Sequence, residues 1–260
     1  NYTITRGATL PNALDEISGM VHYNGKIYGH QDSGGPTAIY EVNPSNGSIT
    51  KTITLQGVTN VDWEDMTQDD THFYIADTGN NYGKRKDLTI YHVDKNFMLQ
   101  DSIKIRYAKQ DSFNKNKKTK YDAETLIAYG DSLLVFSKNR KSYNSQLYAF
   151  PKKAGQYSLT SLKKFKVNAL ITGGDYSAKS KRMALTGYLP NRSQYLLVAD
   201  NFSLATIDDI EFKRYRLPLK QAQVEAVKIL DNDSIWISSE GEGSAIPFLQ
   251  KIDLNSLRQE

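Results

Sequence analysis

The sequence predicts an all-β fold, a five-bladed β-propeller of four-stranded antiparallel blades that forms one domain over residues 1–260. Two observations predict it: one side-chain position recurs five times, and a strand-rich pattern follows each recurrence. A repeat of about 50 residues indicates one structural unit used several times, and propellers place such units around a central channel. The recurring position is occupied by Ser18, Glu64, Glu124, Asp175 and Glu225.

Each unit has the same order of short β-rich runs, and a large apolar residue lies ten residues after each recurring position. In the first unit, the Asn24-Gly25 pair is a strong signal for a tight hairpin turn. The strands expected in the five units are 17–23, 26–30, 38–42 and 48–55; 65–67, 72–76, 88–93 and 102–107; 125–129, 132–137, 146–150 and 157–165; 176–178, 182–186, 195–199 and 210–216; 226–230, 234–238 and 247–252.

The fifth unit has only three strands, and an unassigned strand lies at the start of the chain. Residues 2–9 alternate polar and apolar side chains. If this strand pairs with the last sheet, the ring closes and two exposed sheet edges disappear. A six-bladed alternative needs another unit between Glu64 and Glu124. The excess length there is polar and rich in Lys and Asn, so five blades are favoured.

Composition excludes several classes of protein. The net charge of +4 is small beside 33 basic and 29 acidic residues, and the one dense basic run, residues 115–120, is typical of a solvated loop. We therefore expect no nucleic-acid partner. No apolar stretch is long enough to span a membrane. The chain has no cysteine, which excludes disulfides, thiolate metal sites and cysteine nucleophiles. The polar composition and the start at Asn1 favour an exported monomer of bacterial origin.

The recurring position is expected to line the channel. Four carboxylates and one hydroxyl would meet there, and like charges in one channel either stay partly protonated or bind a cation. Ca²⁺ takes roughly six to eight oxygen ligands. The predicted ligands are Ser18, Glu64, Glu124, Asp175 and Glu225. The alternative is a polar lining in which each acid bonds to a neighbouring blade.

A second group of residues follows the second strand of each unit, and here the units differ. Divergence at one place in a regular repeat predicts a binding face. We call this expected face the mouth of the channel. Asp32, Asp77 and Glu240 are the candidate acids or bases. The candidate ligand-binding residues are His30, Asn80, Lys138, Arg140, Tyr188 and Arg192, whose cations suit an anionic group. The same segments also read as ordinary turns, and no known nucleophile motif is present.

Several segments resemble a known family. EISGMVHYNGKIYGHQDSGGPTAIYEV, DWEDMTQDDTHFYIADTGNN and YDAETLIAYGDSLLVFSKNR are similar to parts of the calcium-activated nucleotidases, the secreted apyrases. The resemblance implies a five-bladed propeller with a central Ca²⁺ on Ser18, Glu64, Glu124 and Glu225. Two departures stand out: Asp175 replaces a serine ligand, and the arginine of a DDRTG-like segment is missing from residues 30–34. The WED and ADTGNN pieces also resemble uncharacterised exported bacterial propellers with esterase-like or phytase-like domains.

These observations lead to three functional hypotheses. The first is metal-assisted hydrolysis of a phosphate ester or anhydride, with Ca²⁺ as the cofactor and a small anionic ligand. The second is a non-enzymatic module that binds a glycan or a protein. The third is a glycosidase that uses paired carboxylates on a sugar-like ligand. The sequence leaves open whether the protein is an enzyme.

Overall fold

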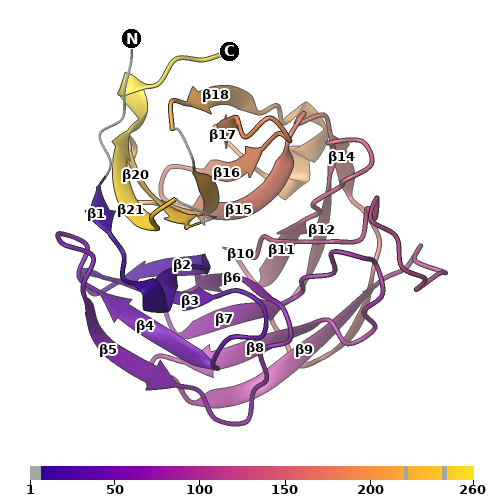
Figure 1. The fold of residues 1–260 in the computed structure, drawn as a ribbon. Helices are drawn as coiled ribbons and strands as arrows, with labels where there is room; N and C mark the ends of the chain where they lie inside the picture. Colours follow the sequence, from indigo (N-terminus) through magenta and orange to yellow (C-terminus); the bar gives the residue numbers. More distant parts are fainter. Residues whose placement is uncertain (1–6, 220–221, 242–244) are drawn as a thin grey trace.

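The computed structural model describes residues 7–219, 222–241 and 245–260. Five sheets stand around a common axis, and the chain passes through them in order from indigo to yellow (Figure 1). The first blade contains β2 (Ile17–Tyr23), β3 (Lys26–Gln31), β4 (Ala38–Val42) and β5 (Ile49–Thr54). The second contains β6 (Trp63–Gln68), β7 (His72–Asp77), β8 (Thr89–Asp94) and β9 (Leu99–Tyr107).

The remaining blades follow the same antiparallel plan. The third contains β10 (Ile127–Tyr129), β11 (Ser132–Phe136), β12 (Ser145–Pro151) and β14 (Lys163–Phe165). The fourth contains β15 (Leu170–Ser177), β16 (Arg182–Tyr188), β17 (Gln194–Ala199) and β18 (Lys213–Leu217). The fifth contains β19 (Gln223–Ile229), β20 (Ser234–Glu240), β21 (Phe248–Asp253) and β1 (Ala8–Thr9). Three short 3₁₀ helices, η1 (Asn12–Leu14), η2 (Leu204–Asp209) and η3 (Leu254–Ser256), lie between or after strands.

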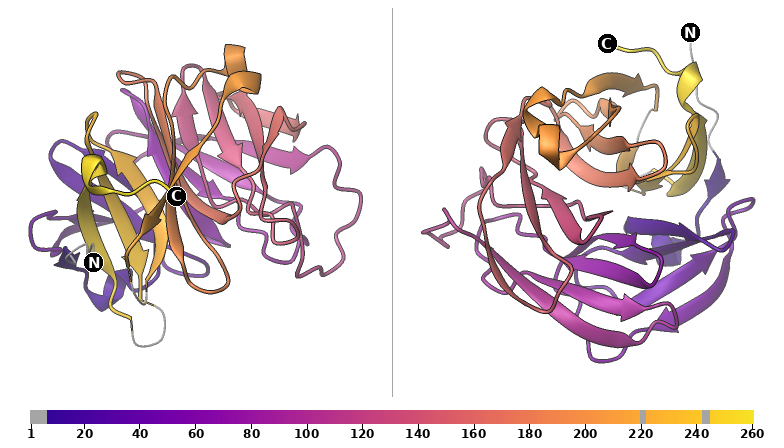
Figure 2. Two further views of the ribbon diagram at one scale, coloured as in Figure 1. Left: turned by 90° about the horizontal axis from the view of Figure 1, so that it is seen from above. Right: turned by 180° about the vertical axis from the view of Figure 1, so that it is seen from behind.

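The five-bladed propeller is therefore confirmed, and the six-bladed alternative is wrong. Residues 108–126, where a sixth unit would have to fit, contain only an isolated bridge between Ala123 and Ser137. Figure 2 gives two further views of the ribbon, from above and from behind. None of the described helices is long and apolar enough to cross a membrane.

The ring closes through β1. Ala8 pairs with Leu249 and Thr9 with Phe248, so the start of the described chain completes the last blade. The pairing confirms that residues 8–9 belong to the closing strand expected from the sequence. Residues 2–6 of that strand lie outside the described residues.

The outer edge of the third unit differs from expectation. The predicted strand 157–165 is two strands, because its first part leaves the third blade. Residues 155–159 form β13 (Gly155–Leu159), which runs parallel to β9 and becomes the fifth strand of the second blade. Leu159 is buried in the apolar cluster that contains Ile105, and this contact holds β13 on the second blade. β14 then returns to pair with β12.

Five apolar clusters hold the ring together, and each lies between two adjacent blades. Trp63 and Phe73 of the second blade, for example, pack with Val21 and Ile39 of the first. Burial of apolar surface stabilises the fold by about 25 cal/mol per Å² and is the main stabilising term. Each blade depends on both neighbours for this burial, so the inner ends of the strands are held at fixed positions around the channel.

Candidate functional site

The innermost strand of four blades contains a register shift near its start. The shifts lie between Ile17 and Met20, Trp63 and Asp65, Ile171 and Gly173, and Val224 and Ala226. An extra residue in one strand bends it and re-aims its side chain. In the third blade the corresponding place lies between the Ala123 bridge and β10. The residues at these places are Ser18, Glu64, Glu124, Thr172 and Glu225, and all five are buried.

Thr172, not Asp175, therefore occupies the shared position in the fourth blade. Asp175 lies three residues further along β15 in regular pairing with Ala184. The expected strand 176–178 begins at Leu170, because the glycines before Asp175 are inside the strand rather than in a turn. A Cβ on Gly173 would collide with the backbone of Glu225, so this glycine permits close approach of β15 to β19.

The two hydroxyls of this position bond to the next blade. Ser18 Oγ donates to the carbonyl of Glu64, and Thr172 Oγ1 donates to the carbonyl of Val224 at 2.6 Å. These two bonds tie neighbouring blades together. Glu64 and Glu124 behave differently, because their carboxylates gather with other acids at the end of the channel where the inner strands begin.

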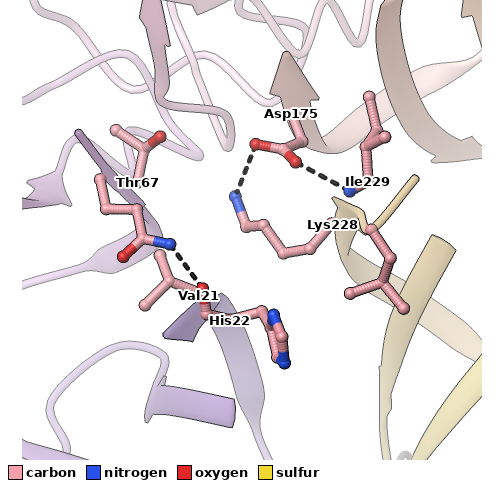
Figure 3. A pocket seen from close by; sticks show the side chains of 8 residues that line it. Val21, His22, Thr67, Asp175, Lys228 and Ile229 are labelled. Carbon is pink, nitrogen blue, oxygen red and sulfur yellow. Dashed lines mark hydrogen bonds and ion pairs between the residues drawn. The ribbon is translucent and has the colours of Figure 1, made fainter. Parts of the chain in front are cut away.

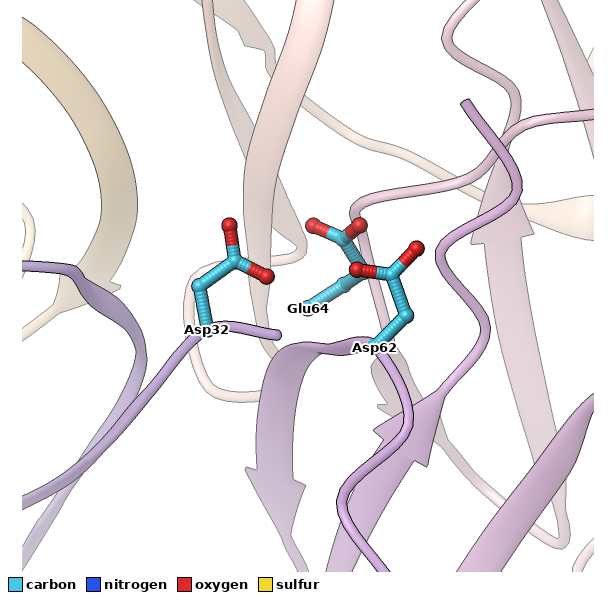
Figure 4. A group of neighbouring side chains, drawn as sticks. All are labelled: Asp32, Asp62 and Glu64. Carbon is cyan, nitrogen blue, oxygen red and sulfur yellow. The ribbon is translucent and has the colours of Figure 1, made fainter. Parts of the chain in front are cut away.

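Five carboxylates form an acidic cluster there. One oxygen each from Asp32, Asp62 and Glu64 lies within 4.8 Å of the others, and the same holds for Glu64, Asp122 and Glu124 (Figure 4 shows the first group). Glu64, Asp122 and Glu124 are buried. Buried acidic residues of this arrangement could hold a metal ion, because hard cations prefer oxygen ligands.

Asp62 and Asp122 were not anticipated from the sequence, although a signal was present. Each lies two residues before a recurring glutamate, in the sequences Asp62-Trp63-Glu64 and Asp122-Ala123-Glu124. Side chains two residues apart in an extended chain share a face. The D-x-E spacing therefore places a second acid beside each of these glutamates.

The loop after β7 positions the cluster. Asp77 accepts hydrogen bonds from the backbone N–H groups of Asp62 at 3.0 Å and Val61 at 3.3 Å, and it forms a 2.8 Å ion pair with Arg85. Its oxygens are therefore engaged by structural partners. A Cβ on Gly79 would collide with both Asp62 and Glu64, so glycine is required for the two carboxylates to reach their places.

Asn80 connects this loop to the third blade. Its backbone N–H donates to Asp122 Oδ1 at 2.7 Å, and its side-chain amide donates to the carbonyl of Tyr121 at 2.9 Å. Asn80 Oδ1 accepts from the backbone N–H of Arg85. Asn80 is thus a buried link between blades, and it orients Asp122 rather than an external ligand.

Two cations lie on one side of the cluster. Lys138 forms an ion pair with Glu124 and lies 5.1 Å from the ring centroid of Tyr188. Arg140 lies 3.0 Å from Asp122 Oδ2 and 3.5 Å from Glu124 Oε1. Lys138, Arg140 and Tyr188, all expected at the mouth, are thus brought together. Among the described residues, no Lys or Arg forms an ion pair with Asp32, Asp62 or Glu64.

The crowding of the acids raises their pKa values. Burial, followed by the charges of Asp32 and Asp122, raises the pKa of Asp62 to about 7. Burial and the neighbouring Glu124 raise the pKa of Glu64 well above its ordinary value. Burial raises the pKa of Glu124 to about 7, although Lys138 opposes this shift. The acids therefore resist ionising together without a cation.

The other residues expected at the mouth are placed differently. His30 is buried against Trp63, with ring centroids 5.4 Å apart, and burial lowers its pKa to about 4. Arg192 lies in the exposed turn after Leu189. Glu240 pairs with Gln223 across β19 and β20, and its charge contributes to the raised pKa of Glu225. His30 is thus a core residue beneath the site.

Asp175 belongs to a pocket at the C-terminal ends of the inner strands (Figure 3). None of the described residues that line this pocket belongs to the acidic cluster. Asp175 Oδ1 lies 3.6 Å from Lys228 Nζ, and Asp175 Oδ2 accepts from the backbone N–H of Ile229 at 2.8 Å. Burial raises the pKa of Asp175. The pocket has a volume of about 260 Å³ and is lined by Val21, His22, Thr67, Gln68, Asp175, Lys228, Ile229 and Leu230.

Several solved structures align with this chain at low sequence identity. A GH43 β-1,3-galactosidase aligns with a TM-score of 0.57 and 10% identity, over 97% of this chain and 60% of that chain. A putative TolB from Agrobacterium tumefaciens aligns with a TM-score of 0.49 and 10% identity, over 94% of this chain and 79% of that chain. Hydrazine synthase from Kuenenia stuttgartiensis aligns with a TM-score of 0.48 and 10% identity, over 88% of this chain and 74% of that chain.

The likeness to the galactosidase supports the propeller fold and nothing finer, because function does not follow from fold. This chain also spans only 60% of that protein's length. No protein-family model matches the chain, and no curated protein matches it in sequence. The resemblance to the calcium-activated nucleotidases is not confirmed by these comparisons.

Proposed function

We propose that the protein binds a divalent cation, Ca²⁺ first, at Asp32, Asp62 and Glu64, and hydrolyses a phosphate ester or anhydride beside it. One observation carries the proposal: these three carboxylates converge within 4.8 Å, and no basic side chain of the described residues pairs with them. Glu124 and Asp122, by contrast, already have Lys138 and Arg140 as counter-charges. Asp32 and Asp62 feel the charges of Lys138 and Arg85 only from a distance. The part of the cluster without a contacting counter-charge is the part that fits a cation.

The residues pass a chemical test of fit. The donors are hard carboxylate oxygens, which suit Ca²⁺ and Mg²⁺, and no soft ligand accompanies them. Gly79 leaves the space that brings Asp62 and Glu64 together. Such an ion would supply positive charge to an anionic substrate and lower the pKa of a coordinated water. Our proposed ligand set keeps Glu64 from the five residues expected from the sequence and adds Asp32 and Asp62. It leaves out Ser18, Glu124, Asp175 and Glu225.

The neighbouring side chains have separate roles in this proposal. Lys138 has three N–H donors, of which Glu124 uses one, and the others can bind a phosphoryl oxygen. Arg140 and Tyr188 border the same place and orient the anion. Glu124 is our proton acceptor, because a pKa near 7 suits a base at neutral pH. An exported protein would meet the free Ca²⁺ that the site requires.

Calorimetric titration with Ca²⁺ and assays with p-nitrophenyl phosphate, nucleoside diphosphates and phytate test the proposal. We expect binding and chelator-sensitive turnover in the unaltered protein. Asp62→Asn and Glu64→Gln should abolish both. Asp131→Asn, at an exposed acid in a turn of the third blade, is the matched control and should change neither. Absence of Ca²⁺-dependent turnover on all three substrate classes would refute the hydrolytic role.

A glycosidase is the second candidate, supported by one specific observation. The oxygens of Asp62 and Glu64 lie within 4.8 Å, which is near the carboxylate separation of about 5 Å in retaining glycosidases. The raised pKa of Asp62, about 7, would suit a general acid. Turnover of aryl glycosides in the presence of a chelator would favour this reading. Binding of glycans without turnover would favour a non-enzymatic module.

A further inference from the structure

Three loops at the mouth end of the channel carry an unusual share of the positive charge. Residues 82–86, 109–120 and 138–141 together contain 11 of the chain's 33 basic residues and one acidic residue, Asp111. We call these loops the basic collar. Its exposed lysines are Lys84, Lys86, Lys109, Lys115, Lys117, Lys118, Lys120 and Lys141.

Hydrogen bonds join the three loops of the basic collar into one surface. The backbone N–H of Asn116 donates to the carbonyl of Tyr82 at 2.8 Å, and Gln110 Nε2 donates to the carbonyl of Gly83 at 2.8 Å. Thr119 is buried, and its carbonyl accepts from the backbone N–H of Arg140 at 3.2 Å. All three loops are therefore joined to one another.

Aromatic side chains reinforce the junction. Lys115 Nζ lies 4.8 Å from the ring centroid of Tyr82, and Lys86 Nζ lies 4.8 Å from that of Phe113. Each contact joins loop 82–86 to loop 109–120. The sequence pattern KNKKTK predicted a solvated loop, and all four of its lysines are exposed. The backbone between them is nevertheless held by the hydrogen bonds of Asn116 and Thr119.

The collar is continuous with the acidic cluster. Arg140, at the inner edge of the collar, contacts Asn81, Asp122 and Glu124. Glu64 shares the second acidic group with Asp122 and Glu124. A ligand bound beside Lys138 and Arg140 would thus have the exposed lysines of the basic collar next to it, on the side of the third blade. None of Lys84, Lys117, Lys118 and Lys141 forms an ion pair with a described residue.

We propose that the substrate of this site is a linear chain of phosphates, whose end lies at the acidic cluster and whose length lies along the basic collar. This inference rests on the proposed function. Repeated lysines favour a ligand with repeated negative charge. Phosphate is favoured over other anions because carboxylate-bound hard cations commonly bind substrate phosphates directly. The collar therefore determines specificity for substrate length, while the cluster holds the reacting end.

Binding of linear inorganic phosphates tests the proposal without requiring turnover. Tripolyphosphate and a long-chain polyphosphate are titrated at the same buffered free Ca²⁺. We expect the long chain to bind at least about tenfold more tightly. Lys117→Gln/Lys118→Gln/Lys120→Gln should remove that gain and lower the slope of log affinity against log salt by about 3. Tripolyphosphate affinity should change less than about threefold.

The matched control is Lys51→Gln/Lys153→Gln/Lys179→Gln, which removes the same charge from exposed sites elsewhere. It should keep the preference for the long chain. Equal affinity for short and long phosphates would overturn the proposal, as would equal losses in the two triple variants. Single-stranded DNA binding as tightly as polyphosphate would overturn the assignment to a phosphate chain.

The two proposals fail in different ways. If the collar lysines produce the length dependence but no substrate is hydrolysed, the hydrolytic function is wrong and the collar stands. If p-nitrophenyl phosphate is hydrolysed with Ca²⁺ and chain length has no effect on binding, the collar is wrong and the hydrolytic function stands.

Discussion

Asp77 Oδ1 accepts a 3.0 Å hydrogen bond from the backbone N–H of Asp62, so a carboxylate outside the acidic cluster holds one of its members. Asp77 is buried and also pairs with Arg85. Its structural partners distinguish it from the catalytic base that the sequence suggested. The difference leads to a prediction about stability as well as activity.

Asp77→Asn should lower the free energy of unfolding by about 2–3 kcal/mol, because Arg85 loses a buried counter-charge. It should also weaken Ca²⁺ binding, since the segment at Val61 and Asp62 loses its anchor. Urea unfolding and calorimetry measure the two effects. Asp87→Asn removes the other, exposed partner of Arg85 and should cost under about 1 kcal/mol. Loss of turnover with unchanged stability and Ca²⁺ affinity would instead restore Asp77 as a base.

Asp62→Asn should stabilise the cation-free protein at pH 8. The pKa of Asp62 is about 7 in the folded state and lower in the unfolded state, so the folded state holds more protons between about pH 4 and pH 7. Stability is therefore lost as pH rises through this window. A folded-state pKa of about 7 in place of about 4 corresponds to about 4 kcal/mol. Solvent screening of this half-buried group should reduce the gain from Asp62→Asn to about 2 kcal/mol at pH 8, and the gain should vanish near pH 4.

Urea unfolding in a chelator across this pH range measures the gain, with Asp131→Asn as the control. A decrease in stability at pH 8 would contradict the electrostatic account of the cluster. The same crowding predicts that Ca²⁺ affinity rises as pH increases through about 7, because the ion then no longer displaces a proton from Asp62.

Gly79→Ala should weaken Ca²⁺ binding by at least about tenfold without removing any charge. The new methyl group would collide with Asp62 and Glu64 and force the carboxylates apart. Gly35→Ala is the control, because the nearest atom to its new Cβ lies 3.3 Å away on a flexible Gln31 side chain. Unchanged Ca²⁺ affinity in Gly79→Ala would show that convergence of the two acids is not needed.

The pair of Asp175 and Lys228 should behave as a buried ion pair separate from the cation site. Lys228→Met should destabilise the protein by about 3 kcal/mol, and adding Asp175→Asn should recover most of the loss. Thermal unfolding of the single and double variants measures this. Asp175→Asn should retain the Ca²⁺-dependent rise in melting temperature, which Glu64→Gln should lose. If Asp175→Asn also lost it, Asp175 would belong to the cation site.

The fold was predictable because its signals are sequence patterns that repeat along the chain. Alternation within strands, the Asn24-Gly25 turn and the spacing from Glu64 to Glu124 define blades without knowledge of the third dimension. The position of residues 155–159 at the edge of the second blade was not predictable. A strand that joins a sheet in parallel is selected by tertiary packing, here that of Leu159.

The site was predictable in part, for a related reason. Glu64 and Glu124 follow directly from the repeat, whereas Thr172 was missed because Gly173 and Gly174 look like a turn. Only the approach of the Glu225 backbone explains why the strand continues through Gly173. Asp62 needed one more step, the recognition that residues two apart on an extended chain share a face.

The parallel strand β13 also determines an order of assembly. The outer edge of the second blade at β9 stays uncovered until residues 155–159 are available, after β10, β11 and β12 have been synthesised. The last blade likewise has to wait for β21 before residues 8–9 can complete it. On the ribosome, the second blade is therefore finished only when most of the third exists, and a chain cut between β12 and β13 leaves two blades incomplete instead of one.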